Sequence, residues 1–387
     1  MKNAYIVEDM HFSTLFGRGI YQPDMKLVSN PLLREDASPA SPLLVNVLSG
    51  ERFFLKVLNC KPSEVERFEE QVLHPAPRKD VCWPSDIIAL DEALSTDTKI
   101  FVSHLYDVGD EKVSQSDRYA LLFQYDGMPD VITWDATIRH IASDDYFDQN
   151  TDKGRNWLNP NIRDLAISLV QALNRINESG YWYFDLHPER ILVSDDETKR
   201  VYLDYSNLIY SQSNLSLERK NSVTSPDAGW YPVEFAEPAY VRGTHEVFDI
   251  ETQNYSLTAF LFHLFYGRYA YDGEAMSGRL DYSEDSHYLW FRDYYKHPIF
   301  IFEPDNTNNG IHEDNPDDKE QQLIDLWYNS PKKLRELFIS TLRRENAERQ
   351  TSSGQPISVH NPTPSDWLNL FMEFGWYQKG RHERRAY

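Results

Sequence analysis

Two short apolar segments, each with an aspartate at or beside its end, constrain the fold of this chain more than any other feature of its sequence. The segment YWYFDLHPERILV (181–193) places Asp185 between two runs that are typical of strands. The segment VYLDYSN follows and ends its own strand-like run at Asp204. The sequence Leu-His-Pro after Asp185 favours a tight turn. The question is why a chain would place two aspartates at the ends of short strands on either side of a turn.

The composition indicates an ordered protein with an acidic surface. Of the 387 residues, 41% are hydrophobic and 14% aromatic, which favours one or two folded domains over disorder. Acidic residues outnumber basic ones by 61 to 39, which gives a net charge of −22. Such a surface repels phosphates of nucleic acids and anionic lipids, so we expect neither nucleic acid nor a membrane as a partner.

Cysteine usage and hydropathy predict a cytoplasmic location. The two cysteines, Cys60 and Cys82, belong to no Cys/His cluster, which favours a reducing compartment and argues against a disulfide framework or a common zinc site. The N-terminus lacks the apolar core of a signal peptide. The longest apolar run, LTAFLFHLFYG (257–267), has about half the length that a membrane span needs, so we interpret it as a buried helix.

Strand patterns dominate the first third of the chain and helical patterns the rest. VNVLSGERFFLKVLN (45–59) predicts a hairpin, and PSEVERFEEQVL (62–73) predicts a helix. NPNIRDLAISLVQALNRINESG predicts an amphipathic helix with a proline start and a glycine stop. From about residue 246 the segments DIETQNYSLTAFLFHLFYG, SPKKLRELFISTLRRE and TPSDWLNLFMEFGWY predict further helices.

The order of certain residues along the chain matches the needs of phosphoryl transfer. That reaction needs a lysine on a strand, an acid that holds the lysine, a carboxylate beside the attacking hydroxyl and a second carboxylate on the metal. The candidates, in this order, are Lys56 in FFLKVL, Glu69 or Glu70 in the next helix, Asp185 and Asp204. Any one of them alone is more often a surface lysine or a turn-forming aspartate.

On these residues the sequence resembles the protein kinase superfamily. YFDLHPERILV resembles its catalytic loop, and LDYSN resembles the segment that carries its magnesium ligand. The resemblance implies an α+β chain with a bilobal protein-kinase-like fold, that is, a small strand-rich N-lobe with one helix and a larger helical C-lobe. It implies ATP with Mg²⁺ or Mn²⁺ as cofactors. Lys56 would bind the phosphates, Asp185 would be the catalytic base and Asp204 the metal ligand, and the hinge near Tyr125 to Met128 would receive the adenine.

Later segments extend the resemblance to about residues 30–377. GWYPVEFAEP resembles the end of the activation segment, with Glu234 or Glu237 in the place of its closing glutamate. The helix after it would carry Asp249 as its buried acid, and NPTPSDWLNLF resembles the closing helix. The implied organisation is an N-terminal extension (1–29), an N-lobe (30–127), a C-lobe (128–377) and a tail (378–387).

Two segments, CWPSDII and FIFEP with WYNSPKKLRELFISTL, look like a subgroup of bacterial eukaryotic-like Ser/Thr kinases. Members of that subgroup often occur with PP2C-type phosphatases and von Willebrand A proteins. The resemblance therefore implies a protein substrate or signalling partner, with proteins of those two kinds as candidates.

Several residues depart from the kinase pattern. The region expected to hold the glycine-rich loop, REDASPASPLLVNV (34–47), contains no glycine, although glycines allow backbone N–H groups to approach phosphate. Arg190 replaces the asparagine that would hold a second metal; a cation cannot ligate magnesium but can contact phosphate. His187 replaces the lysine of the catalytic loop, and DLHP also resembles small-molecule kinases such as the aminoglycoside phosphotransferases.

Two further departures concern arginines that are missing. Phe184 stands where the arginine that receives a phosphorylated activation loop would be, so we expect phosphorylation there not to be the switch. Asn361 stands in place of the usual partner of the closing glutamate, and Arg349 is the candidate to replace it. The first hypothesis is a Ser/Thr protein kinase that transfers the γ-phosphate of ATP. A pseudokinase scaffold that binds a partner without catalysis is the alternative, and a small-molecule phosphotransferase is the third.

Overall fold

The protein divides into two compact units. The computed structural model describes residues 10–29, 40–58, 65, 68–69, 72–73, 81–89, 119–125, 131–143, 157–184, 186–188, 191–195, 199–204, 208–210, 234–245, 248–273, 294–304, 309 and 318–378. One unit comprises Met1–Ile132 with Leu203–Tyr205, and the other comprises Thr133–Tyr202 with Ser206–Tyr387. The first is rich in strands and the second in helices, in agreement with the α+β class expected from the sequence.

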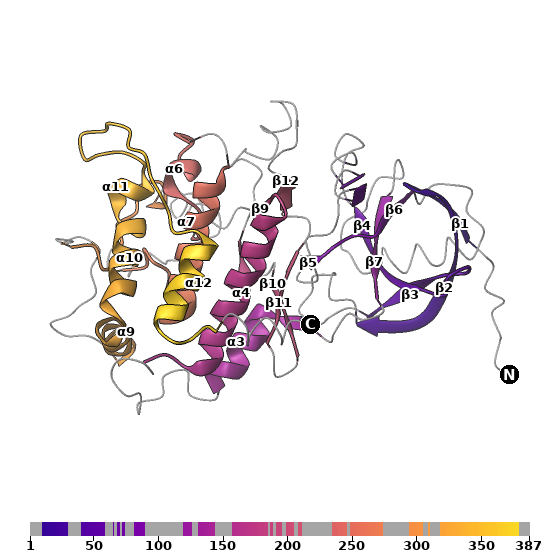
Figure 1. The fold of residues 1–387 in the computed structure, drawn as a ribbon, viewed down its shortest axis with the longest axis horizontal. Helices are drawn as coiled ribbons and strands as arrows, with labels where there is room; N and C mark the ends of the chain where they lie inside the picture. Colours follow the sequence, from indigo (N-terminus) through magenta and orange to yellow (C-terminus); the bar gives the residue numbers. More distant parts are fainter. Residues whose placement is uncertain are drawn as a thin grey trace, which may run out of the picture. The chain divides into compact units, whose positions relative to one another are not determined.

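A closed antiparallel barrel forms the core of the strand-rich unit (Figure 1). Its order is β1-β2-β3-β4-β7-β6. Strand β1 closes the barrel, because it pairs with β2 on one side and, through Thr14 opposite Ile88, with β6 on the other. The strands are β1 (Met10–Thr14), β2 (Gly17–Ser29), β3 (Ala40–Asn46), β4 (Arg52–Leu58), β6 (Asp86–Ala89) and β7 (Tyr119–Gln124), and β5 (Val81–Cys82) lies outside the barrel.

Strands β4 and β7 supply much of the apolar interior of the barrel. Phe53, Phe54 and Leu55 are buried in β4, and the side chains of residues 120–123 are buried in β7. Such continuous apolar runs fit strands that are covered on both faces. The hairpin predicted at 45–59 is confirmed: β3 and β4 are antiparallel, and Gly50 adopts a φ of 75° in the turn between them.

Strands β1 and β2 lie within residues that the sequence analysis placed ahead of the strand-rich lobe. The sequence pattern predicted no strand there, since Gly17, Gly19 and Pro23 are residues that strands disfavour. Strand β2 pairs with β3 on both sides of an irregularity between Asp24 and Val28. This irregularity begins one residue after Pro23, which is still in register with Leu44 although proline has no N–H for the ladder.

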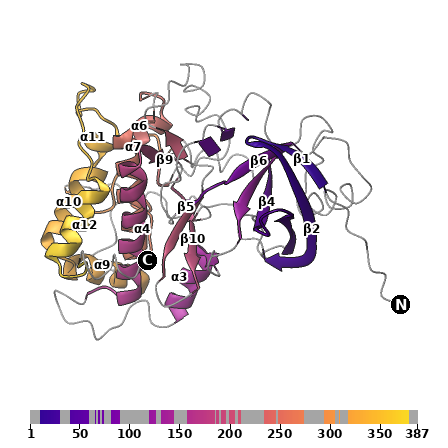
Figure 2. The ribbon, with the colours of Figure 1, turned by 45° about the vertical axis from the view of Figure 1, so that its right-hand side comes forward.

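Two central helices, α4 and α7, lie side by side in the helical unit (Figure 2). Helix α4 has the predicted ends: Asn159 caps it, Pro160 is its first residue, and Gly180 follows with a φ of 84°. Helix α7 is buried nearly all round, as expected for the apolar run at 257–267. No helix among the described residues is long and apolar enough to cross a bilayer.

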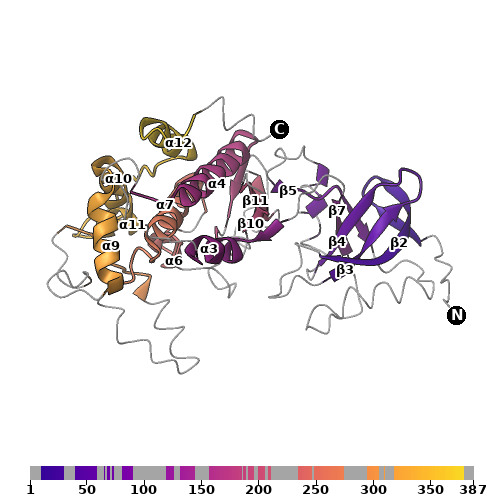
Figure 3. The same cartoon turned by 90° about the horizontal axis from the view of Figure 1, so that it is seen from below.

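Helix α12 packs against α4 (Figure 3). Aromatic rings from residues near both helices pack on one another. Trp157 stacks on Tyr266 of α7 with ring centres 5.9 Å apart and also contacts Trp376. The helices are α3 (Trp134–Ser143), α4 (Pro160–Glu178), α6 (Pro238–Val241), α7 (Ile250–Tyr266), α9 (Asp318–Asn329), α10 (Lys332–Leu342), α11 (Arg344–Ala347) and α12 (Pro364–Glu373). The short strands are β8 (Val131–Thr133), β9 (Tyr181–Tyr183), β10 (Ile191–Ser194), β11 (Val201–Asp204) and β12 (Leu208–Tyr210).

Candidate functional site

The pairing of β9 with β12 explains the position of the two aspartates in the chain. These strands are antiparallel, with Tyr183 opposite Leu208 and Tyr210 opposite Tyr181. Tyr183 and Leu208 therefore lie at the same end of this ladder. At that end β9 leads on to Asp185, and β12 is reached from Asp204. The topology places Tyr183 and Leu208, which precede Asp185 and follow Asp204 in the sequence, opposite each other at one end of this ladder.

A buried glutamine holds the strand that leads to Asp185. The backbone N–H of Tyr183 donates to Oε1 of Gln253 on α7, at 2.7 Å, and Gln253 is 1% exposed. On the other side of Asp185 in the sequence, Leu186 and Pro188 are buried. A hydrogen bond in such surroundings fixes the backbone, because breaking it would leave a buried donor without a partner.

His187 lies against an aromatic cluster. Its ring centre is 6.1 Å from that of Phe235, in an edge-on arrangement. Phe235 in turn contacts His263 and Tyr269, which stack on each other with ring centres 4.4 Å apart. Burial lowers the pKa of His263 to about 4, a bond with the backbone of Arg268 opposes this effect, and the charge of His187 lowers the pKa further.

Lys56 lies on β4, opposite Leu121 of β7, and its side chain is half-buried. It follows the buried residues Phe54 and Leu55. The described residues of the segment 62–73 are helical, as predicted, and Glu69 is half-buried among them. No ion pair joins Lys56 to Glu69 in the described part of the chain. The structure therefore does not bring the first-choice glutamate to the lysine.

Tyr125 follows β7, and its N–H is already in use. It donates to the carbonyl oxygen of Arg52 at 2.8 Å and extends the β4–β7 ladder. The guanidinium of Arg52 lies 4.7 Å from the ring centre of Tyr125, and Phe54 meets the same ring edge-on. Of its two backbone groups, the carbonyl oxygen is therefore the one through which Tyr125 can contact an adenine.

The remaining predicted site residues lie outside the described part of the chain. Glu70, Met128, Asp185 and Arg190 are not among the described residues. For Asp204 the backbone is described, as the last residue of β11 and the parallel partner of Cys82. In the described residues no three His, Cys, Asp or Glu side chains gather as a metal site would require.

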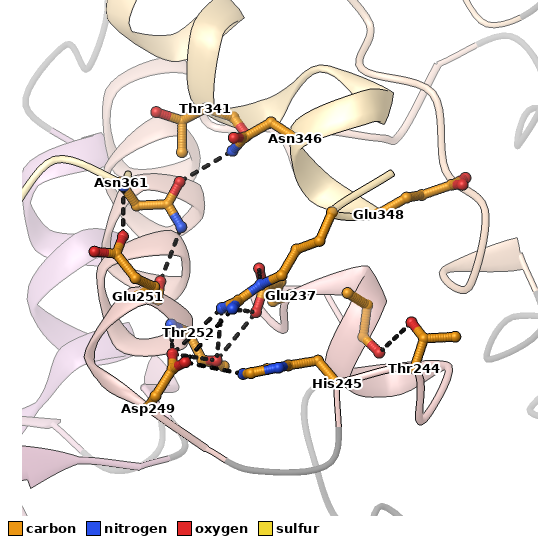
Figure 4. A network of polar contacts seen from close by, with 12 residues as sticks. Glu237, Thr244, His245, Asp249, Glu251, Thr252, Thr341, Asn346, Glu348 and Asn361 are labelled. Carbon is orange, nitrogen blue, oxygen red and sulfur yellow. Dashed lines mark hydrogen bonds and ion pairs between the residues drawn. The ribbon is translucent and has the colours of Figure 1, made fainter. Parts of the chain in front are cut away.

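An ion-pair network ties the end of the predicted activation segment to the helices (Figure 4). Arg349 donates to both carboxylate oxygens of Glu237, at 2.6 and 2.9 Å. Glu237 is completely buried and also accepts from the hydroxyl of Thr252 at 3.0 Å. Of the two predicted alternatives, Glu237 rather than Glu234 pairs with the arginine. The expectation that Arg349 replaces the arginine missing at position 361 agrees with this pair.

The backbone of Arg349 is adapted to this contact. Its φ is 51°, in the left-handed region that side chains other than glycine rarely adopt. Burial lowers the pKa of the Arg349 guanidinium, but its bonds to Glu237 and Asp249 outweigh burial and hold the pKa above its usual value. Burial raises the pKa of Glu237, and the bonds from Arg349 oppose this only in part.

Asp249 is not the buried acid that the sequence analysis expected. Its side chain is 31% exposed, and it caps α7 by accepting the N–H of Thr252 at 2.8 Å. It also pairs with His245 at 3.0 Å and with Arg349 at 3.3 Å. Burial raises the pKa of Asp249, but these bonds outweigh it and hold the pKa well below its usual value. The buried polar residues of α7 are neutral, and Gln253, one turn further along, is one of them.

Asn361 connects the last helix to the same network. Its side-chain N–H group donates to the carbonyl oxygen of Glu251 at 2.9 Å, and its carbonyl oxygen accepts from Asn346 at 3.0 Å. Its backbone N–H donates to the Glu251 carboxylate at 2.6 Å. An asparagine here positions the chain ahead of α12 (Figure 4). Glu237 pairs with Arg349 instead.

The sequence analysis did not identify Gln253 as a functional residue. The signal that could have identified it is its position inside a helix that was predicted to be buried. Gln253 and Asn254 are amides inside a segment that is otherwise predicted to be buried, and a buried amide needs a hydrogen-bond partner elsewhere in the protein. Searches of family models and of curated proteins match nothing to this chain.

Proposed function

We propose that the chain is a bilobal, ATP-dependent protein kinase of the Ser/Thr type. One observation carries the proposal: the antiparallel pairing of β9 with β12, which leads the segments of Asp185 and Asp204 away from the same end of one ladder. Phosphoryl transfer needs two carboxylates close together, one at the attacking hydroxyl and one at the metal. The Glu237–Arg349 pair supports the same proposal, because the kinase resemblance required a substitute arginine.

In this proposal each residue of the site has its own role in phosphoryl transfer. Asp185 would orient the substrate hydroxyl and take its proton, and the bond from Tyr183 to Gln253 would hold the backbone from which Asp185 extends. Lys56 would bind the phosphates of ATP, and Asp204 would hold Mg²⁺ or Mn²⁺. The bound metal supplies charge that stabilises the phosphates during transfer. His187 would face the phosphates with a smaller positive charge than a lysine has.

The chemistry of two of these groups partly fits ATP. Lys56 offers a half-buried ammonium group, and Tyr125 offers a carbonyl oxygen. The sequence predicted a phosphate-binding loop in the region 34–47, which contains two prolines and no glycine. The structure divides this region between the connection from β2 to β3 and β3 itself. Prolines lack N–H donors for a phosphate. We therefore expect weak binding of ATP in comparison with kinases that have the glycines.

A pseudokinase scaffold is the second candidate, and the occupied N–H of Tyr125 together with the glycine-free connection favours it. In that case, the protein would bind a signalling partner without transferring phosphate. A PP2C-type phosphatase or a von Willebrand A protein would be such a partner. Nucleotide would raise the melting temperature or leave it unchanged, but no phosphate would move.

The test is transfer of labelled γ-phosphate from ATP, first with Mg²⁺ and then with Mn²⁺. We compare the wild type with Asp185→Asn, and we use Asp195→Asn as the matched control, because Asp195 is exposed at the end of β10. Loss of a general base typically costs on the order of 10²- to 10⁴-fold in rate. We expect that loss in Asp185→Asn and an unchanged rate in Asp195→Asn. If the wild type transfers nothing with either metal, the kinase proposal fails and the scaffold remains.

A further inference from the structure

Glu348 gathers three basic side chains from separate parts of the helical unit. Its Oε1 accepts from Arg344 at 2.9 Å and lies 3.1 Å from Nδ1 of His297, and its Oε2 lies 3.1 Å from Arg242. Burial raises the pKa of Glu348, but the bonds from these three side chains outweigh burial and hold the pKa below its usual value. Glu348 therefore keeps its negative charge over the pH range in which histidine titrates. Its side chain points away from Glu237, so this cluster is separate from the network around that acid (Figure 4).

Arg242 connects the end of α6 to the end of α11. It is the C-cap residue of α6, and its Nη2 donates to the carbonyl oxygen of Glu348, the C-cap residue of α11, at 3.0 Å. Its Nε and Nη2 also donate to the hydroxyl of Thr244, at 3.3 and 3.2 Å. The side chain of Arg242 is 12% exposed. The position of this guanidinium therefore affects how the residues after α6 are held.

One atom of His297 lies between the arginine and the acid. Nδ1 is 3.1 Å from Nη1 of Arg242 and 3.1 Å from Oε1 of Glu348. A ring nitrogen either has a lone pair and accepts, or carries a proton and donates. Nδ1 can therefore accept from Arg242 or donate to Glu348, but it cannot do both at once. The His297 side chain is 53% exposed, so protons of the solvent reach it.

The other charges near His297 come from its own segment and from the residues packed against it. Arg344 binds the same oxygen of Glu348 as His297 does, and Lys296 precedes His297 in the chain. Glu303 accepts the backbone N–H of Arg344 at 3.3 Å. Arg344 and Lys296 oppose a positive charge on the ring, whereas the two glutamates favour it.

We propose that His297 is a pH-dependent switch at the end of α6: the neutral ring accepts a hydrogen bond from Arg242, and the protonated ring releases Arg242 and donates to Glu348. A protonated ring 3.1 Å from a guanidinium repels it, so the two groups must separate. Because Arg242 caps α6 and binds Thr244, its release loosens the residues after that helix. This inference does not depend on the proposed kinase function.

The first test measures the ¹⁵N resonance of Nδ1 in protein labelled on histidine, at about pH 8 and about pH 5, on either side of the ordinary titration of histidine. The signal that is missing from the spectrum of His297→Gln belongs to His297. We expect Nδ1 to have a lone pair at the higher pH and a proton at the lower one. A proton on Nδ1 at both pH values overturns the proposal.

The second test measures hydrogen exchange of the backbone N–H groups of residues 243–245, which donate to the carbonyl oxygens of Tyr240 and Ala239. After correction for the intrinsic effect of pH, exchange in the wild type should be about 3- to 10-fold faster at the lower pH, the range for one lost hydrogen bond. His297→Gln should exchange equally at both pH values, because glutamine does not titrate.

His360→Gln is the matched control, because His360 is an exposed histidine 3.4 Å from the carboxylate of Glu251. It should keep the pH dependence of the wild type. Equal corrected exchange at both pH values in the wild type overturns the proposal. A pH dependence that survives undiminished in His297→Gln overturns it as well, since the effect would then come from another group such as His245.

Discussion

Replacing Arg349 by methionine tests the buried ion pair most directly. Methionine fills much of the same volume, but it removes both hydrogen bonds to Glu237, at 2.6 and 2.9 Å. The carboxylate of Glu237 is completely buried, so it would remain inside the protein with the hydroxyl of Thr252 as its remaining side-chain partner. The variant therefore leaves a buried charge without its cation, and it also removes the longer contact of Arg349 with the more exposed Asp249 at 3.3 Å.

The size of the expected loss in the free energy of unfolding follows from the burial of the Glu237–Arg349 pair. Removing one member of a buried pair typically costs about 3–5 kcal/mol of the free energy of unfolding. The Arg349 side chain is 17% exposed, so water can enter part of the space it leaves. We therefore expect a loss near the lower end, about 3 kcal/mol. The double variant Glu237→Gln/Arg349→Met carries no unpaired buried charge at position 237 and should be more stable than Arg349→Met alone.

The assay is unfolding in urea, followed by tryptophan fluorescence, which reports on the packed rings around Trp157. The control is Lys332→Met, because Lys332 pairs with Glu336 on the surface and such pairs contribute about 0–1 kcal/mol. A midpoint for Arg349→Met no lower than that of Lys332→Met would refute the reasoning. A double variant less stable than Arg349→Met would refute it as well.

Two further substitutions test the surroundings of the loop. Gln253→Met keeps the volume of the side chain but removes the acceptor for the Tyr183 N–H. It should lower the free energy of unfolding by about 1–3 kcal/mol in the same urea assay. An unchanged midpoint would contradict this role of Gln253. His263 has a pKa of about 4 in the folded protein, below its ordinary 6.5, so the unfolded chain binds the proton first and stability falls as the pH drops from about 6.5 to 4. That loss should reach about 3 kcal/mol and be absent in His263→Phe, and equal pH slopes for the two proteins would count against it.

Local signals sufficed for the elements whose ends are marked by their own residues. Asn159, Pro160 and Gly180 bound α4 as the sequence indicated, since capping needs no knowledge of the rest of the chain. The hairpin around Gly50 was equally clear. Strands β1 and β2 were missed because their glycines and Pro23 disfavour strands locally, and only pairing with distant strands stabilises them.

The sequence predicted most of the residues of the candidate site, but it did not predict which of them pair with each other or are buried. The sequence named Glu237 and Arg349, but it could not choose between Glu237 and Glu234, because both lie in one irregular segment. The resemblance implied Asp249 as the buried acid, whereas the structure buries the neutral Gln253 and uses Asp249 as a cap. Which side chain of a helix faces inward depends on the packing around it, and a charge is the costlier group to bury.

The closure of the barrel by β1 has a consequence for how the protein avoids self-association. An open sheet ends in two strands whose free N–H and C=O groups can recruit strands from other molecules, and a closed barrel has no such strands. In this unit, β2 and β6 would be the two ends. The five residues of β1 pair with β2, and Thr14 pairs with β6. Loss of that short segment would turn two protected strands into templates for aggregation, although no residue of the proposed catalytic site would change.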